Sequence, residues 1–231
     1  MISFIVPAHD EERLIGASLD ALNATINDLH LTCEIIVVVD ASTDATAAIA
    51  RRAGARVVEV EHRQIAATRN AGAALAEGEL LVFVDADTLV NPTLVRSAIR
   101  AIDNGAVGGG CAVLMEGTLS WSERTALRFF TWLFRLTRIA PGCFLFCTRA
   151  AFDAVGGFDE AWFAGEDVAM SRALARQGRF VILRESVQTS ARKLRTHTLR
   201  EHLHLIWRFL WRGRSMLKSR DKLDLWYGRR R

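Results

Sequence analysis

Proline and cysteine are both scarce in this chain of 231 residues, which has 3 of the former and 4 of the latter. The cysteines are Cys33, Cys111, Cys143 and Cys147. They show neither the spacing of a zinc site nor the density of a disulfide scaffold, so we expect reduced, buried thiols. Because half of the residues are hydrophobic, a disordered chain is excluded and a substantial core is expected.

Long apolar segments are missing as well. No apolar run reaches the ~18 residues that a simple membrane-spanning helix needs. The apolar run at residues 2–8 has no charged leader before it and is too short for the core of a signal peptide. We therefore expect a cytoplasmic protein.

The net charge of +4 is divided unevenly along the chain. Residues 192–231 contain thirteen Lys or Arg and three acids, which leaves seventeen basic and twenty-three acidic residues in the rest of the chain. An acidic body is thus followed by a basic tail. We place the boundary near Ser190, with a domain at residues 1–190 and a tail at 191–231.

Strands and helices are expected to alternate through the first half of the chain. Apolar runs predict strands at residues 2–7, 34–39, 56–60 and 80–84, and helical periodicity predicts helices at 11–24, 45–54 and 65–76. This order favours a mostly parallel α/β sheet with helices on both faces. Acidic clusters follow the first, second and fourth strands, at the edge where open α/β sheets bind ligands.

The second half alternates less regularly. We expect helices at residues 92–102 and 166–176, strands at 106–115 and 144–148, a turn at 156–160 and an aromatic amphipathic segment at 121–138.

Two carboxylates directly follow the strand predicted at residues 80–84. If the chain stays extended, Asp85 and Asp87 project to the same side, about 7 Å apart. Two hard oxygen donors at this spacing can share one divalent cation, or one can hold the cation while the other holds a hydroxyl. The alternative is an Asp-rich turn that caps the next segment.

Several motifs occur in a specific order along the chain. They are Val6-Pro-Ala-His-Asp-Glu-Glu12, Val39-Asp-Ala-Ser-Thr-Asp-Ala-Thr46, Ala67-Thr-Arg-Asn-Ala-Gly72, Val84-Asp-Ala-Asp-Thr88, and Gly157-Phe-Asp-Glu160 with Gly165-Glu-Asp167. Together they resemble the family 2 glycosyltransferases of GT-A fold, over roughly residues 2–185. The resemblance implies a Rossmann-like, mostly parallel sheet flanked by helices and a nucleotide-diphosphate sugar as donor.

The resemblance also implies where the nucleotide lies. The segment from Pro7 through His9 to Glu11 is expected to border it, although Asp stands at position 10, where Asn is usual. Asp40, with Ser42 beside it, resembles the acid that recognises the base or the ribose. The structural alternative for this second segment is helix capping.

The next two motifs resemble the donor-binding part of the family. Arg69 resembles an Arg on the nucleotide side of the pocket, and its structural alternative is an exposed helical Arg. Asp85 and Asp87 resemble the Asp-x-Asp motif, which implies binding of a divalent cation, Mn²⁺ or Mg²⁺, and of the donor diphosphate. Charge supports this, because an acidic body would repel a diphosphate unless a cation bridged the two.

The Glu166-Asp167 pair resembles the catalytic pair of the family, which implies that Asp167 is the general base for the acceptor hydroxyl and Glu166 its supporting neighbour. One in-line displacement without a protein nucleophile inverts the anomeric carbon. Trp162, just before this pair, is a candidate for stacking on a sugar, with plain packing as the alternative.

Beyond the core domain, His197 is a candidate metal ligand, because some relatives complete the metal shell with a His, and Arg192 is a candidate phosphate clamp. Residues 199–217 show the pattern of a basic amphipathic helix, which favours the inner face of the plasma membrane and a lipid or lipid-linked acceptor. The alternatives are packing on its own domain or on a second copy in a homodimer. No nucleic-acid-binding motif accompanies the basic residues.

Two other functions compete with the transferase. Val82-Phe-Val-Asp-Ala-Asp-Thr88 also matches the motif of haloacid dehalogenase-type phosphatases, with Asp85 as nucleophile and Asp87 as acid. That motif usually sits on the first strand, however, and the phosphatase leaves the segment at residues 39–46 unexplained. The other rival is a catalytically silent, membrane-associated scaffold that kept the fold.

Overall fold

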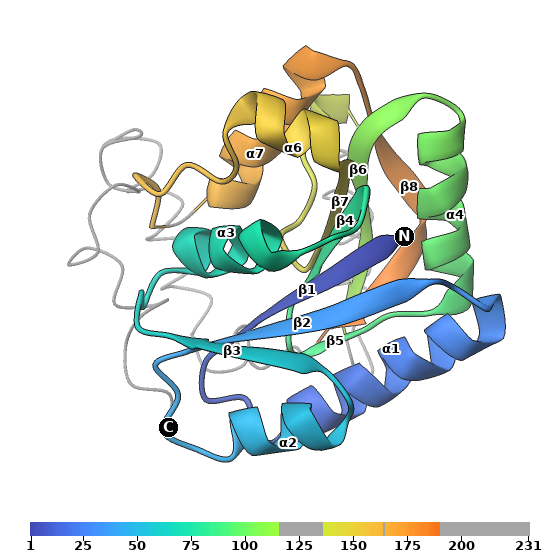
Figure 1. Ribbon diagram of the computed structural model, residues 1–231. Coiled ribbons are helices and arrows are strands. Elements are labelled where there is room, and N and C mark those ends of the chain that lie inside the picture. Colours follow the sequence, from blue (N-terminus) through green and yellow to red (C-terminus); the bar gives the residue numbers. More distant parts are fainter. Residues whose placement is uncertain (116–135, 164, 190–231) are drawn as a thin grey trace.

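A computed structural model describes residues 1–115, 136–163 and 165–189, which form an α/β fold around one eight-stranded sheet (Figure 1). Most of the predicted aromatic segment, Arg192, His197 and the amphipathic tail lie outside the described residues. The boundary near residue 190 therefore stays a prediction.

In the first half of the chain, strands and helices alternate as predicted. The second half adds both parallel and antiparallel strands to the sheet. They are β1 (Ile2–Ala8), β2 (Cys33–Asp40), β3 (Arg56–Val60), β4 (Leu80–Val84), β5 (Thr88–Leu89), β6 (Ala106–Met115), β7 (Phe144–Thr148) and β8 (Arg179–Thr189), in the spatial order β3-β2-β1-β4-β7-β6-β8-β5. The first four in this order are parallel. β7 is antiparallel to β4 and β6, while β8 is parallel to β6.

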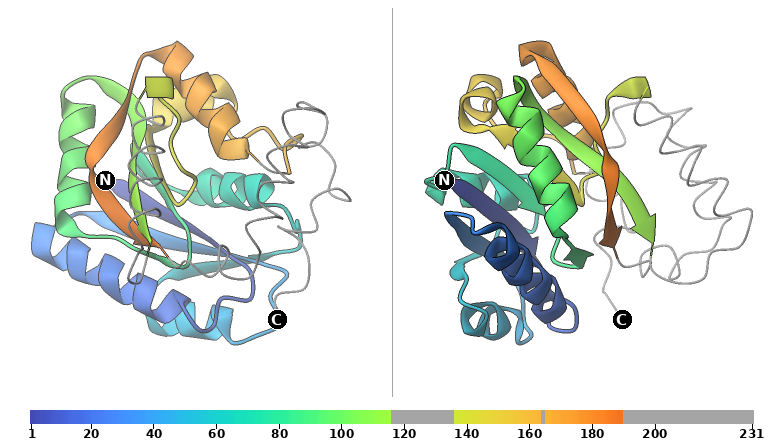
Figure 2. Two further views of the ribbon diagram at one scale, coloured as in Figure 1. Left: turned by 180° about the vertical axis from the view of Figure 1, so that it is seen from behind. Right: turned by 90° about the vertical axis from the view of Figure 1, so that its right-hand side faces the viewer.

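Helices cover both faces of the sheet, as predicted. They are α1 (Ile15–Leu29), α2 (Thr46–Arg52), α3 (Ile65–Leu75), α4 (Pro92–Asp103), α6 (Arg149–Val155) and α7 (Glu166–Gln177). One core contains residues of α1, α2 and α4, and the other contains residues of α3, α6 and α7. The two turned views show α4 lying along β8, with α6 and α7 on the other side of the sheet (Figure 2).

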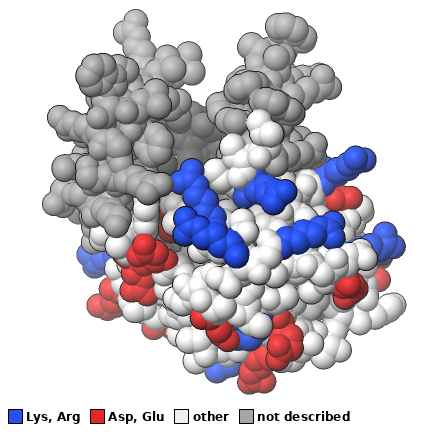
Figure 3. Space-filling model, turned by 90° about the horizontal axis from the view of Figure 1, so that it is seen from above, with Lys and Arg blue, Asp and Glu red and all other residues white. Residues whose placement is uncertain are grey.

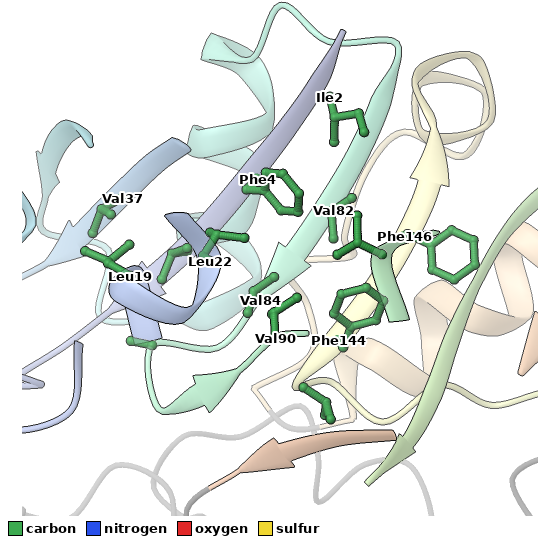
Figure 4. Packing of buried hydrophobic residues seen from close by; sticks show 14 of the residues in the cluster. Ile2, Phe4, Leu19, Leu22, Val37, Val82, Val84, Val90, Phe144 and Phe146 are labelled. Carbon is green, nitrogen blue, oxygen red and sulfur yellow. The ribbon is translucent and has the colours of Figure 1, made fainter. Parts of the chain in front are cut away.

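The period of two in the strands divides side chains between these cores. In β4, Val82 and Val84 point into the first core, and Leu81 and Phe83 into the second. Figure 4 shows Val82 and Val84 together with Phe144 of β7. A strand that is buried on both faces needs an unbroken apolar sequence, which explains why β4 could be recognised from its five apolar residues.

The sheet is strongly curled on its β5 side. Three strands separate β4 from β5 in the sheet, so a flat sheet would hold them about 19 Å apart at about 4.8 Å per step. Only residues 85–87 connect Val84 to Thr88, and four residues span at most about 14 Å. The sheet must therefore bend until β5 returns toward the end of β4.

Several boundaries differ from the sequence prediction. β1 continues through Pro7, which pairs in register with Val38 instead of ending the strand. α1 begins at Ile15, because residues 11–14 form a turn in which the Glu11 carbonyl accepts from the backbone N–H of Leu14 and Ile15. The elements β5, α6 and β8 were not predicted from the sequence. None of the helices in the described residues is both long and apolar enough to cross a membrane.

Candidate active site

The loops after β1 and β2 bind each other at the carboxyl edge of the sheet. The backbone N–H of Asp10 donates to Ser42 Oγ at 3.0 Å, and that of Glu11 donates to Thr46 Oγ1 at 2.8 Å. In return, Asp10 Oδ1 accepts from the N–H of Thr43 at 2.8 Å. Asp10 adopts a left-handed backbone with φ of 49°, which Asp and Asn tolerate better than most residues. The departure from the usual Asn at this position is thus physically mild.

Asp40 connects these loops to α3. Its carboxylate accepts from the backbone N–H of Arg63 at 2.7 Å and of Gln64 at 3.0 Å, and from Thr68 Oγ1 at 2.8 Å. Its carbonyl accepts from His9 Nδ1 at 2.6 Å. The carboxylate therefore satisfies free N–H groups at the start of α3, a structural role. Oδ2 accepts from both Gln64 and Thr68, whereas Oδ1 accepts from Arg63 and has capacity for a further donor. Recognition of the nucleotide by Asp40 therefore stays a prediction.

The Asp85–Asp87 segment is a turn and does not continue β4. The Asp85 carbonyl accepts from the N–H of Thr88 at 3.1 Å, and its own N–H donates to the Cys143 carbonyl at 3.2 Å. Asp87 Oδ1 accepts from Thr189 Oγ1, at the end of β8, at 3.3 Å. The extended geometry expected from the sequence is wrong here, because the curl of the sheet requires the chain to change direction after Val84.

Arg69 joins the turn after β4 to the start of α7. This side chain is only 2% exposed, so an ordinary surface position is excluded. Its Nη1 donates to Glu166 Oε1 at 2.8 Å, and its Nη2 donates to Asp85 Oδ1 and to the Gly142 carbonyl, both at 2.9 Å. The guanidinium carbon lies 5.3 Å from the centre of the Phe158 ring. The guanidinium of Arg69 thus contacts both a carboxylate predicted to bind the donor and a carboxylate of the predicted catalytic pair.

The charges of this site shift two pKa values. Burial alone would lower the pKa of Arg69, but the negative charges of Asp85, Glu166 and Asp167 outweigh it and raise the pKa above its ordinary value. Burial, and then the charge of Glu166, raise the pKa of Asp167 to about 7, against the opposing effect of Arg69 and of a hydrogen bond from the N–H of Val168. A carboxyl that titrates near neutral pH suits a general base.

The loop before α7 is held by the residue next to Arg69. Asn70 Nδ2 donates to the Phe158 carbonyl and to Glu160 Oε1, both at 2.9 Å, and Asn70 Oδ1 accepts from the N–H of Phe158. Within the loop, the indole N–H of Trp162 donates to Asp159 Oδ2 at 2.8 Å. This bond fixes the orientation of a half-buried ring, while its stacking on a sugar stays a prediction.

The donor set at the turn fits a hard divalent cation that also binds a diphosphate. Asp85 and Asp87 bring two carboxylates to this turn, where Asp85 Oδ1 accepts from Arg69 and Asp87 Oδ1 accepts from Thr189. Across the described residues, no three His, Cys, Asp or Glu side chains are grouped to hold a metal by themselves. Mg²⁺-like sites commonly use one or two carboxylates and take the remaining ligands from phosphates and water.

Sequence reasoning missed two members of the site. The Gly142 carbonyl binds Arg69, and a Cβ built on this glycine would lie 3.1 Å from Asp167 Oδ2, so the backbone approaches the carboxylate closely. Thr189 reaches Asp87 from the last strand. No local signal marks Thr189, whereas the Pro141-Gly142 pair before a predicted strand could have indicated a close backbone approach.

Solved structures share this fold. One is a mannosyltransferase from Pyrobaculum calidifontis in complex with GDP-Man and Mn²⁺, which matches with a TM-score of 0.68 and 24% identity over 81% of this chain and 56% of that one. Another is the S. aureus protein TarS in complex with UDP-GlcNAc, with a TM-score of 0.63 and 21% identity over 82% of this chain and 58% of that one. At these identities the likeness concerns the fold, and it confirms the predicted GT-A architecture.

Curated relatives are also similar in sequence. Validoxylamine A glucosyltransferase of Streptomyces hygroscopicus is 29% identical over 85% of this chain and 57% of its own length. Glucosyl-3-phosphoglycerate synthase of Mycolicibacterium paratuberculosis is 38% identical over 39% of this chain and 29% of its own length. The chain therefore spans little more than half of the first relative and under a third of the second.

The family model for "Glycosyl transferase family 2" matches residues 3–156, which include the turn at Asp85 and Asp87. The phosphatase alternative is not favoured, because its motif would here follow β4 and lies inside this match. With the match extending over well over half of its length, the chain belongs to glycosyl transferase family 2.

Proposed function

We propose that this protein is an inverting glycosyltransferase, which transfers a sugar from a nucleotide-diphosphate donor to an acceptor hydroxyl and depends on a divalent cation. The observation that carries the proposal is the shared guanidinium of Arg69, which holds Asp85 and Glu166 at 2.9 and 2.8 Å. The turn proposed to bind the donor and the pair proposed to catalyse the transfer therefore contact the same side chain.

The chemistry requires a base next to the acceptor. In the proposed step the acceptor O–H gives its proton to Asp167, and its oxygen forms a bond to the anomeric carbon. The bond from that carbon to the diphosphate oxygen breaks, and its electron pair leaves with the nucleoside diphosphate. A single displacement of this kind inverts the configuration. The pKa of Asp167, raised to about 7, lets its carboxylate take up the proton near neutral pH.

Asp85 and Asp87 would hold the cation through their carboxylates. A bound Mn²⁺ or Mg²⁺ would stabilise the negative charge of the donor diphosphate and of the leaving group. Pro7 and Asp40 lie at the carboxyl ends of β1 and β2, and His9, Glu11 and Ser42 lie on the loops that follow, where all five would border the nucleotide. The Mn²⁺ and GDP-Man in the P. calidifontis structure support a cation and a nucleotide sugar.

The acceptor is the least constrained part of the proposal. The basic, amphipathic sequence at residues 199–217 favours a lipid or lipid-linked hydroxyl at an anionic membrane surface. Arg192 and His197 are proposed to contribute a phosphate contact and a metal ligand.

Thermal unfolding with nucleotides tests the proposal. UDP, GDP and dTDP are added to the full chain with and without manganese, because a ligand that binds only the folded state raises the melting temperature. One nucleotide is expected to stabilise the protein in the presence of manganese and much less in its absence. The same shift with and without manganese would contradict the proposed metal dependence, and no shift with any nucleotide would contradict the donor assignment.

Donor hydrolysis separates the transferase from a silent scaffold. The nucleotide sugar that carries the stabilising nucleotide is incubated with the wild type, with Asp85→Ala and with Asp167→Asn. The wild type is expected to release the sugar, and both variants are expected to be slower by at least about a hundredfold. An inactive wild type that still binds nucleotide would favour the scaffold.

A further inference from the structure

Arg69 is costly to bury. Removing a guanidinium from water is offset only when its N–H groups are paired, and in the part of the chain that the structure describes its Nε has no hydrogen-bond acceptor. Buried ion pairs can often be replaced by apolar residues of similar volume without loss of stability. Stabilisation of the fold is therefore a weak explanation for the burial of Arg69. Its effect on the positions of its carboxylate partners is a better one.

The partners of Arg69 have separate tasks in the proposed reaction. Asp85 lies on the donor side, where the diphosphate and its cation would bind. Glu166 is the first residue of α7, and the base Asp167 follows it. The same Nη2 that binds Asp85 also binds the Gly142 carbonyl, and a Cβ built on Gly142 would lie 3.1 Å from Asp167 Oδ2. One planar group thus fixes both sides of the site.

We infer that Arg69 is a positioning residue of the transfer reaction: by holding Asp85 and Glu166 on one guanidinium, it sets the distance between the donor and the base Asp167. This inference rests on the proposed function. It differs from the expectation that Arg69 contacts the nucleotide, because three of its N–H groups donate to the protein and the side chain is only 2% exposed.

The helix that carries Arg69, α3, is held in place at its start and along its face toward the sheet. Its start is fixed by the carboxylate of Asp40, which accepts from Arg63, Gln64 and Thr68. One turn after Thr68, Gly72 packs so closely on the sheet that an added Cβ would lie 2.5 Å from Ile5 Cγ2. The helix cannot move toward or away from the sheet without breaking these contacts, so the guanidinium has a fixed position.

Lysine is the informative replacement. It keeps the positive charge, but its single ammonium is a point charge and cannot reproduce the planar fork that places separate nitrogens on Asp85 and Glu166. The test compares the wild type, Arg69→Lys, Glu166→Gln and the double variant. Arg51→Lys is the matched control, because Arg51 forms an exposed ion pair with Glu59.

Two quantities are measured for each protein. The first is the dissociation constant of GDP or UDP with manganese, by calorimetry. The second is kcat for hydrolysis of GDP-mannose, UDP-glucose or UDP-N-acetylglucosamine, whichever the wild type turns over. Arg69→Lys is expected to lower kcat by about ten- to a hundredfold, since small misplacements of reacting groups have effects of this size. The dissociation constant is expected to change by less than about threefold, which is well under 1.4 kcal/mol.

The double variant tests whether Arg69 acts through Glu166. If it does, the loss of kcat in the double variant is smaller than the product of the two single losses. If the two single losses of kcat multiply in the double variant, the inference is overturned. It is also overturned if kcat, nucleotide affinity and melting temperature all fall together in Arg69→Lys, because Arg69 would then have a general structural role. A wild-type kcat in Arg69→Lys would overturn it as well.

The proposed function fails in a different way. A wild type that binds no nucleotide with manganese overturns the transferase and the inference with it. A wild type that binds and turns over the donor, beside an unimpaired Arg69→Lys, overturns the inference alone.

Discussion

Asp167 gains a proton more readily in the folded protein than in the unfolded chain, because burial and the neighbouring charge of Glu166 raise its pKa to about 7. Between about pH 4 and pH 7 the native state therefore binds more protons than the unfolded state. The stability that this carboxyl contributes is present below about pH 4 and is lost as the pH rises through 7. We expect the unfolding free energy of the wild type, relative to Asp167→Asn, to fall across this range.

Urea denaturation of both proteins in the presence of a chelator measures this difference. Identical pH profiles for wild type and Asp167→Asn would show that the carboxyl titrates at its ordinary value. If Asp167 is the base, turnover of the wild type rises with pH through the same region, since only the carboxylate accepts a proton.

Gly142 offers a second test at this scale. In Gly142→Ala the new methyl group lies 3.1 Å from Asp167 Oδ2 and 3.4 Å from Arg69 Nη2, so it must displace the carboxylate by a few tenths of an ångström. We expect kcat for donor hydrolysis to fall by about tenfold, with nucleotide affinity nearly unchanged. An unchanged kcat would mean that the base tolerates the displacement.

The acidic residues of the candidate site were predictable from the sequence, but the groups that bind these acids were not. Asp40, Asp85 and Asp167 stand in motifs next to predicted strand or helix ends, where local patterns are strongest. The partner groups of Gly142 and Thr189 are contributed by chain segments distant in sequence. Their roles arise from the pairing of β7 with β4 and of β8 with β5, which no local pattern encodes.

At the level of elements, α3 determines how the site is assembled, and its close packing can be tested. In Gly72→Ala the added Cβ would lie 2.5 Å from Ile5 Cγ2 and 2.9 Å from Val38 Cγ2. We expect a loss of unfolding free energy of about 1–3 kcal/mol, the usual size of an overpacking effect.

Gly16→Ala is the matched control. Gly16 also lies in a helix, α1, but its new methyl would meet Ile49 Cγ2 at an ordinary 3.6 Å. This substitution is expected to stabilise the protein by about 0.4–1 kcal/mol through the entropy of the unfolded chain. Equal effects of the two substitutions in denaturant unfolding would exclude close packing at α3.

Long periodic elements were predictable and short or irregular ones were not. β4 is a continuous apolar run, β1 and β2 are largely apolar, and the alternation of β1 to β4 with helices determined the fold class. β5 has two residues and α6 has seven, too few for a period to emerge. β8 pairs with β6 through two register shifts, which interrupt the alternation that identifies a strand.

For the whole molecule, charge distribution gives a prediction about membranes. Seen from above, the described surface carries several Lys and Arg side chains around a largely uncharged area, with acidic groups toward the rim (Figure 3). The basic groups of the body and those of the tail therefore have to be tested separately as sources of attraction to anionic lipid. We expect the full chain to sediment with vesicles of phosphatidylcholine and phosphatidylglycerol, and less so as salt is added.

Two variants distinguish the sources of this binding. Replacing Arg200, Arg208 and Arg212 by Gln is expected to reduce the fraction of protein that sediments. The free energy of vesicle binding should weaken by about 1 kcal/mol per residue. Replacing the exposed Arg51, Arg52 and Arg56 removes the same charge from the body and is expected to have little effect. Equal losses would show that net charge alone attracts the vesicle.

The curled sheet has a mechanical consequence for the turn at residues 85–87. These three residues connect β4, an inner strand, to β5, the strand at the edge of the sheet, and two of them are the proposed cation ligands. Anything that clamps both carboxylates would also restrain the far rim of the sheet from fraying. Backbone amides of Gln188 and Thr189 should then take up deuterium more slowly once manganese and nucleotide are added, although they lie about a hundred residues further along the chain.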